Sequence, residues 1–173
     1  MSAKQGYSGD KVKELCLYGV FSAVCLALSF LESLLPLDFI APGVKLGLSN
    51  AVCVIFAYKG DFKGALLINS VRIILSALLF GSAVSFAFSF SAGIISLLFT
   101  CLMAKINFFS TVAVSTAAGV IHNIVQMLVG IIFIGTGVLF YFPVLVVTGA
   151  LSGATVGIIS NLIFKKIKTN QKK

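Results

Sequence analysis

The only arginine of the chain, Arg72, lies inside an apolar run that covers residues 65–80. An arginine near the centre of a bilayer costs about 2.5–3.5 kcal/mol on insertion scales, and such residues usually have a function. Its guanidinium is a planar fork of five donors that matches a carboxylate or a phosphate, whereas a lysine offers only a point charge. Arg72 is therefore the first candidate for binding an anionic group.

Further polar side chains occur within the apolar runs. Asn69 precedes Arg72 by three residues, so a helix places both side chains on one face. His122 and Gln126 are four residues apart and share a face in the same way, with Asn123 beside them. We expect these groups to lie at similar depth on neighbouring helices.

Lys45 and Asn50 stand near the start of another apolar run, whereas the acidic residues Glu32 and Asp38 are expected at the outer edge of the membrane. Cations and amides without an acid at the same depth favour an anionic ligand. We predict a substrate-binding site formed by Arg72, Lys45, Asn50, Asn69, His122, Asn123 and Gln126.

Each of these residues also has a purely structural interpretation. A single histidine in a helix bundle is often a hydrogen-bonded core residue, and asparagine and glutamine commonly link membrane helices. Arg72 and Glu32 together form an internal strut if they pair with each other. That alternative predicts no ligand.

The composition indicates which elements position these residues. Hydrophobic residues make up 59% of the 173 and charged residues 10%, with a mean hydropathy of +1.11. A soluble domain is about 45–50% apolar and about 25% charged. The chain is therefore predicted to be an all-α integral membrane protein of one domain, and its net charge of +8 reflects membrane orientation rather than nucleic-acid binding.

Six transmembrane helices are expected, because a span needs about 20 residues. Lysines, glycines and prolines separate the apolar runs, of which the second is short. The membrane domain is placed at 13–164, between a tail of residues 1–12 and a basic tail of residues 165–173. The six predicted spans are 13–35, 46–58, 64–80, 84–104, 110–134 and 138–164.

If successive spans cross the membrane in alternate directions, nearly all lysines fall on the same side of the membrane. Both tails, Lys59, Lys63 and Lys105 fall on one side, and Lys45 is the only basic residue on the other. By the positive-inside rule both termini are cytoplasmic, and the chain is expected as a multi-pass protein of the cell membrane.

Three glycines at four-residue spacing, Gly149, Gly153 and Gly157, give the last span a face on which another helix approaches closely. Packing inside the bundle is favoured over a dimer face. The chain contains no G-x-x-x-x-G-K-[ST] nucleotide loop, no carboxylate pair within a span and no Asp-rich cluster. We predict no catalysis, no metal and no intrinsic cofactor.

Four ordered motifs resemble a known family. They are PGVKLGLSN at 42–50, Arg72 followed by LSALLFG at 75–81, AGIISLL at 92–98 and HNIVQ at 122–126. Together they resemble the family called both heptaprenyl diphosphate synthase component I and Gx transporter proteins, over nearly the whole chain. The first name implies a non-catalytic membrane accessory subunit of the synthase in isoprenoid or menaquinone biosynthesis.

The family is also similar in size and layout to the substrate-binding S-components of energy-coupling factor (ECF) transporters. That similarity implies an S-component-like bundle of six helices which captures a small anionic micronutrient or metabolite, with a flavin-type or isoprenoid-related compound as the most plausible substrate. Its partners are then the ECF coupling transmembrane subunit and ABC ATPases, which use the ATP. Ala23 and Ala27 stand where S-components dock onto the coupling subunit. We expect the transporter role first and the synthase role as the alternative.

Overall fold

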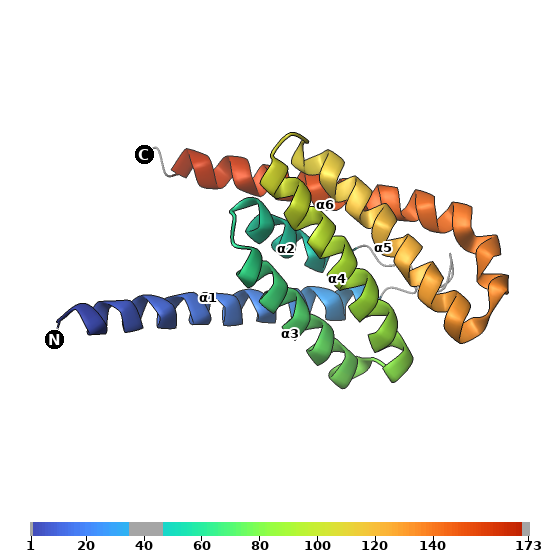
Figure 1. Ribbon diagram of the computed structural model, residues 1–173, viewed down its shortest axis with the longest axis horizontal. Helices are drawn as coiled ribbons and strands as arrows, with labels where there is room; N and C mark the ends of the chain where they lie inside the picture. The colour runs from blue at the N-terminus through green and yellow to red at the C-terminus, as the bar shows by residue number, and fades with distance from the viewer. Residues whose placement is uncertain (1, 35–46, 171–173) are drawn as a thin grey trace.

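The computed structural model describes residues 2–34 and 47–170, and the side chains of residues 9–34 and 47–166. Over these ranges the chain is helical and has no strand, as Figure 1 shows. The elements are α1 (Ser2–Ser33), α2 (Leu48–Tyr58), α3 (Phe62–Phe80), α4 (Ala83–Ile106), α5 (Thr111–Ile134), the 3-10 helix η2 (Thr136–Tyr141) and α6 (Phe142–Asn170). The predicted all-helical fold is confirmed.

Five helical segments are long and apolar enough to cross a membrane, namely Gly9–Ser33, Phe62–Phe80, Ala83–Ile106, Thr111–Ile134 and Thr136–Lys166. The sixth apolar helix, α2, has only 11 residues. At 1.5 Å per residue it spans about 16 Å, roughly half of a hydrocarbon core of about 30 Å. The described helices therefore include five that are long enough to span a membrane, and the helix at the expected second span is only about half that length.

The polar residues between the apolar runs end and begin the helices. Asp61, Ser82 and Ser110 each accept a hydrogen bond from the backbone N–H three residues further on, so each caps the helix that follows. Asn107 ends α4 with a φ of 53°, in the left-handed region that asparagine tolerates. The turns fall within a few residues of their predicted positions.

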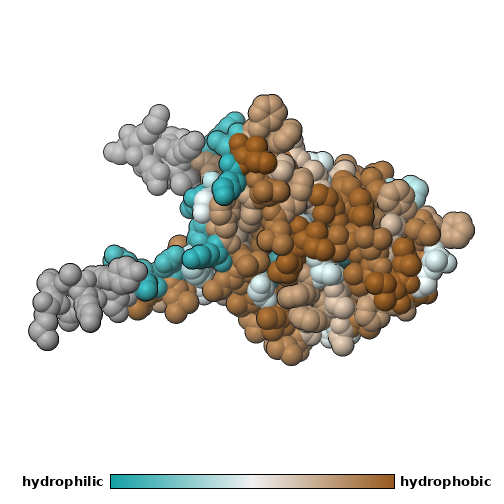
Figure 2. All heavy atoms as spheres, in the orientation of Figure 1, coloured by the Kyte–Doolittle hydropathy of each residue, from teal (hydrophilic) through white to brown (hydrophobic). Residues whose placement is uncertain are grey.

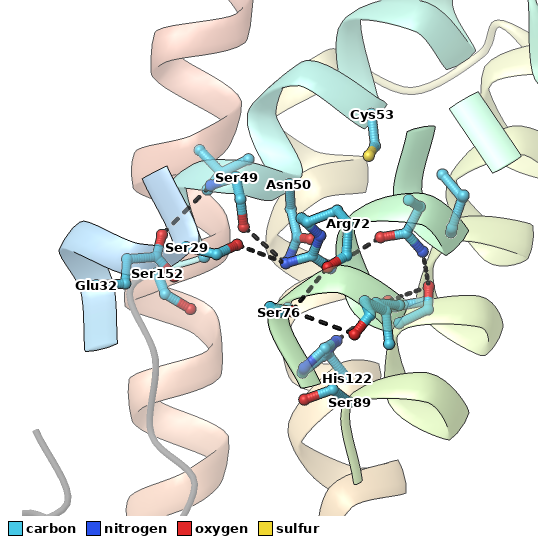
Figure 3. Close-up of a pocket in the computed structure, with 18 of the residues that line it drawn as sticks. Ser29, Glu32, Ser49, Asn50, Cys53, Arg72, Ser76, Ser89, His122 and Ser152 are labelled. Carbon is cyan, nitrogen blue, oxygen red and sulfur yellow. Dashed lines mark hydrogen bonds between the residues drawn. The ribbon is translucent and has the colours of Figure 1, made fainter. Parts of the chain in front are cut away.

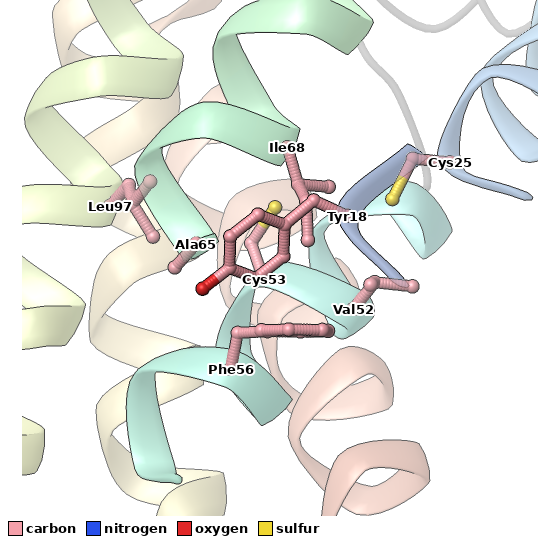
Figure 4. Close-up of a cluster of buried hydrophobic side chains, with 8 residues drawn as sticks. All are labelled: Tyr18, Cys25, Val52, Cys53, Phe56, Ala65, Ile68 and Leu97. Atoms are coloured by element: carbon pink, nitrogen blue, oxygen red, sulfur yellow. The ribbon is translucent and has the colours of Figure 1, made fainter. Parts of the chain in front are cut away.

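The short helix α2 lies at the centre of the bundle. Residues 51–57 are all buried, because α1, α3, α4, α5 and α6 all contact α2. Figure 4 shows the main apolar cluster, which joins α1, α2, α3 and α4. Its members are Tyr18, Cys25, Val52, Cys53, Phe56, Ala65, Ile68 and Leu97.

The glycine face of α6 packs against α5 of the same chain. A Cβ atom on Gly153 would lie 2.4 Å from the carbonyl oxygen of Ser115, and one on Gly157 would lie 2.7 Å from the Cα of Val112. Gly149 likewise meets the backbone of Gly119. Glycines allow these two helix backbones to touch, so α5 is held in a fixed position against α6.

α1 differs from α2, which is largely buried, because only a narrow stripe of its side chains is buried. Tyr18, Cys25 and Glu32 face the bundle, whereas Ala23 and Ala27 are exposed. The predicted docking residues are therefore on the outer surface of the molecule.

Both termini point toward one end of the bundle, and the turns at 59–61 and 107–110 lie toward that end too (Figure 1). We call it the terminal end. The turn at 81–82 and η2 lie toward the opposite end (Figure 1). Figure 2 shows hydrophilic residues gathered near the terminal end and hydrophobic residues over most of the remaining face in view.

A candidate anion-binding cavity around Arg72

A cavity of about 340 Å³ lies between all six α-helices. Ser33, Gly81 and Ser85 line it at the opposite end of the bundle, while Thr100 and Val156 line its deeper part. Its size falls in the range of about 300–1,000 Å³ that is common for small-molecule sites. We call it the Arg72 cavity.

The guanidinium of Arg72 is held by side chains from three helices (Figure 3). Its Nη1 donates to the Oγ of Ser49 on α2 at 2.7 Å and to the Oγ of Ser29 on α1 at 3.4 Å, and Nη2 donates to the Oδ1 of Asn69 at 2.8 Å. The remaining Nε is buried and has no partner in the described part of the chain. The charged group is thus held in place by neutral acceptors, and its hydrogen bonding is incomplete.

Glu32 does not neutralise Arg72 directly. Its side chain is 7% exposed, and Oε1 accepts a hydrogen bond of 3.3 Å from the backbone N–H of Ser49. Within the described ranges no ion pair joins it to the guanidinium. Ser49 stands between the two charges, since its hydroxyl contacts Arg72 and its amide contacts Glu32 (Figure 3).

The first turn of α2 faces the same cavity. Gly47, in the left-handed region with a φ of 72°, precedes the helix, and Ser49 and Asn50 of the first turn line the cavity. The unpaired N–H groups of a helix N-terminus carry a partial positive charge of roughly half a unit. This turn adds to the positive potential of Arg72 and also binds the carboxylate of Glu32.

Asn69 is positioned from a fourth helix. Its side chain is 1% exposed, and Nδ2 donates to the carbonyl oxygen of Gly93 on α4 at 3.1 Å. That bond fixes the amide so that Oδ1 points at Arg72. Asn69 and Arg72, which were predicted to share one helix face, are therefore in direct contact.

Two predicted residues of α5 line the cavity in different ways. The Nδ1 of His122 lies 3.3 Å from the Oγ of Ser96. The Nδ2 of Asn123 donates to the carbonyl oxygen of Leu145 at 2.7 Å and to the Oγ1 of Thr148 at 3.3 Å. Asn123 thus links α5 to α6, which is the structural role that amides commonly have in membrane helices.

Gln126 lies outside the Arg72 cavity and lines a second one of about 150 Å³. Although it is on the next helical turn after His122, the two side chains line different cavities. The expectation of a single site with both residues does not match this arrangement. Lys45, the other predicted cation, lies outside the described residues.

The predicted site residues include none of the serines around Arg72. Nine of them line the Arg72 cavity: Ser29, Ser33, Ser49, Ser76, Ser85, Ser89, Ser96, Ser115 and Ser152. The signal was present on α4, where small or hydroxyl residues at 85, 89, 93, 96 and 100 follow helical spacing along one face. These hydroxyls make the cavity wall polar without adding charge.

Residues 21–163 match the profile of a family described as heptaprenyl diphosphate synthase component I. The chain belongs to this family. Component I is a non-catalytic subunit of the synthase. The match includes every residue that lines the Arg72 cavity, so the cavity is part of the family region. No curated protein and no solved structure matches the chain.

Proposed function

We propose that this protein is a non-catalytic membrane subunit that binds a small anionic ligand, with a phosphate or diphosphate group, in the Arg72 cavity. The observation that carries the proposal is the guanidinium of Arg72, held at three points by neutral side chains in a cavity of ligand size. A guanidinium fixed in advance binds an oxyanion without first losing side-chain freedom.

The charges around the cavity support an anion rather than a cation. Arg72 and the first turn of α2 are positive, and the one carboxylate among the described lining residues, Glu32, is already bound to the backbone of Ser49. Serine hydroxyls supply further donors for phosphate oxygens. A diphosphate is the preferred anionic group, because it is the group in the name of the family's synthase.

A synthase chain is the first candidate for the partner, since the family is named as one component of a synthase. In this reading the protein presents or retains a diphosphate-bearing compound at the membrane, and a separate chain performs the chemistry. Tagged protein purified from its own host membranes is then expected to bring with it a soluble prenyl diphosphate synthase chain, identified by mass spectrometry. If the synthase chain is absent at every detergent concentration, the proposal of a synthase partner is contradicted.

One observation favours a second candidate, an S-component-like transport subunit. We place both termini in the cytoplasm, in line with the lysines near the terminal end. The Arg72 cavity extends to the opposite end, which then faces the outside, as the capture of an external solute requires. The exposed residues Ala23 and Ala27 are the proposed docking face for an ECF coupling subunit.

The same purification separates the two candidates. Recovery of ABC ATPases, and their loss in an Ala23→Leu/Ala27→Leu variant, supports the transport role and contradicts the synthase partner. Recovery of the synthase chain, unaffected by that double variant, supports the first candidate. The matched control is Leu15→Ala, at another exposed position of α1.

A further inference from the structure

The second cavity is lined by α5 residues nearer the C-terminal end of the helix than those at the Arg72 cavity, and it has a different chemical character. Phe88 of α4, Gly130 of α5, Val138 of η2 and Leu145 of α6 contribute to its walls. Nearly all of its lining is apolar. Gln126 is the polar exception in its interior, and Tyr141 is 43% exposed.

The side-chain oxygen of Gln126 is buried without a hydrogen-bond partner. Its side chain is 4% exposed, and its carboxamide has no partner in the described part of the chain, with Oε1 fully enclosed. Asn123, three residues earlier on α5, differs because its amide bonds to α6. An unpaired buried amide costs about 1–3 kcal/mol, so a membrane helix gains by filling the position with leucine unless the amide has a use.

A bound water does not account for this amide. A buried water needs about two to four polar partners, and small apolar cavities stay dry. The interior of this cavity offers one polar side chain. A molecule that is largely hydrocarbon and carries one polar group matches the lining better.

We propose that this cavity binds an apolar alcohol dissolved in the membrane. Its hydroxyl pairs with Gln126, and its hydrocarbon contacts Phe88, Met127 and Leu145. Because Oε1 is enclosed by protein, the alcohol reaches the carboxamide at Nε2, and its hydroxyl oxygen accepts the hydrogen bond. A charged ligand is disfavoured, because no charged side chain lines the cavity.

Entry takes place from the lipid. Ile134, which is 66% exposed, and Tyr141 line the cavity near the end of α5 and in η2, so the cavity reaches the outer surface of the bundle there. The site is separate from the Arg72 cavity, since the two share no lining residue. It goes beyond the proposed function and does not depend on it.

The test uses the full chain in lipid nanodiscs with 1-octanol as the probe and n-octane, at equal mole fraction in the bilayer, as its matched control. The sequence has no tryptophan, so a Tyr141→Trp variant carries a single fluorescent reporter beside the cavity. We expect a saturable fluorescence change with octanol and binding about fivefold or more tighter than that of octane, the effect of one net hydrogen bond. A linear response, or equal binding of the two probes, overturns the proposal.

Two variants in the reporter background complete the test. Gln126→Leu keeps the apolar walls and is expected to bind octanol and octane equally. Gly130→Val is expected to abolish both, because a Cβ there meets Val138 and Phe88 at 3.4–3.5 Å and the added methyl groups enter the cavity. A preserved octanol preference in Gln126→Leu, or preserved binding in Gly130→Val with unchanged helix content, overturns the proposal.

Arg72→Lys in the reporter background is expected to leave octanol binding unchanged. This result distinguishes the site from the Arg72 cavity, so either proposal can fail without the other. Loss of octanol binding in Arg72→Lys, with unchanged helix content, overturns the claim that the two sites are independent.

Discussion

The two cavities along α5 contain two polar groups that are costly in a membrane, and the surroundings of the two groups differ. The guanidinium of Arg72 has acceptors from three helices, whereas the carboxamide of Gln126 has none. The wall around Arg72 is rich in serine, and the wall around Gln126 is nearly all hydrocarbon. Two ligands of different chemistry follow from this contrast, an oxyanion in the first cavity and an apolar alcohol in the second.

Ser49 connects several of the groups around the Arg72 cavity. Its hydroxyl accepts from Arg72, its N–H donates to Glu32, and its carbonyl oxygen accepts a 3.5 Å contact from the thiol of Cys25. One fully buried residue in the first turn of α2 thereby connects α1, α2 and α3. In the described lining of the cavity around Gln126, Leu145 connects two helices, because its carbonyl oxygen accepts from Asn123.

The largest effect is expected where α5, which lines both cavities, packs on α6. Gly153→Ala puts a Cβ 2.4 Å from the backbone oxygen of Ser115, so the helices must separate at a cost of about 1–3 kcal/mol. We expect a lower thermal unfolding midpoint and weaker binding at both cavities. The matched control is Gly19→Ala on α1, where no atom lies within 4 Å of the new Cβ. Equal midpoints for the two variants would contradict close α5–α6 packing.

A smaller effect, confined to one cavity, is expected from Arg72→Lys. A lysine keeps the charge but loses the planar fork, so inorganic diphosphate is expected to bind about tenfold or more weakly in isothermal titration calorimetry. Gln126→Leu serves as the control in the other cavity and should bind diphosphate as the natural chain does. If Arg72→Lys and Gln126→Leu lose diphosphate affinity equally, the claim that only the Arg72 cavity binds the anion is contradicted.

Asn69 is expected to act through Arg72. Asn69→Leu removes both the contact of Oδ1 to the guanidinium and the bond of Nδ2 to Gly93, so Arg72 loses one of its three anchors. Diphosphate binding should weaken about three- to tenfold, less than in Arg72→Lys. Titration of both variants under one set of conditions checks the order, and a larger loss in Asn69→Leu would mean that Arg72 is not the main contact.

The smallest effect, and of opposite sign, is expected from Glu32→Gln. The amide oxygen keeps the bond from the Ser49 N–H, while the removal of a carboxylate beside the cavity reduces repulsion of an anion. Diphosphate should bind about two- to fivefold more tightly. If Arg72 instead depends on Glu32 as an ion-pair partner, the variant binds no better and unfolds at a lower temperature.

Much of the fold follows from the sequence. Apolar runs of span length predict α1, α3, α4, α5 and α6, and capping residues such as Asp61 and Ser110 lie at the predicted turns. The length of α2 was harder to anticipate. Most of its 11 residues are buried by other helices, and an apolar run has the same sequence pattern whether protein or lipid surrounds it.

The candidate site was predicted in part. The contact of Asn69 with Arg72 follows from spacing on one helix, and Asn50 and His122 do line the cavity. Gln126, expected at the same site, lines the second cavity, because helical spacing shows which residues share a face but not where along that face one cavity ends. The serines were not predicted as site residues, because single hydroxyls in membrane helices often bond to their own backbone, as Ser76 does here with the carbonyl of Arg72.

The most direct test of anion binding by Arg72 uses the fact that it is the only arginine. Growth on ¹⁵N-arginine labels the guanidinium of this one residue, and solid-state NMR of the protein in lipid then measures its dipolar coupling to the ³¹P nuclei of bound diphosphate. We predict coupling from direct N–H···O contact, with nitrogen and phosphate oxygen about 2.8 Å apart. Bound diphosphate that shows no ¹⁵N–³¹P coupling to Arg72 contradicts the account.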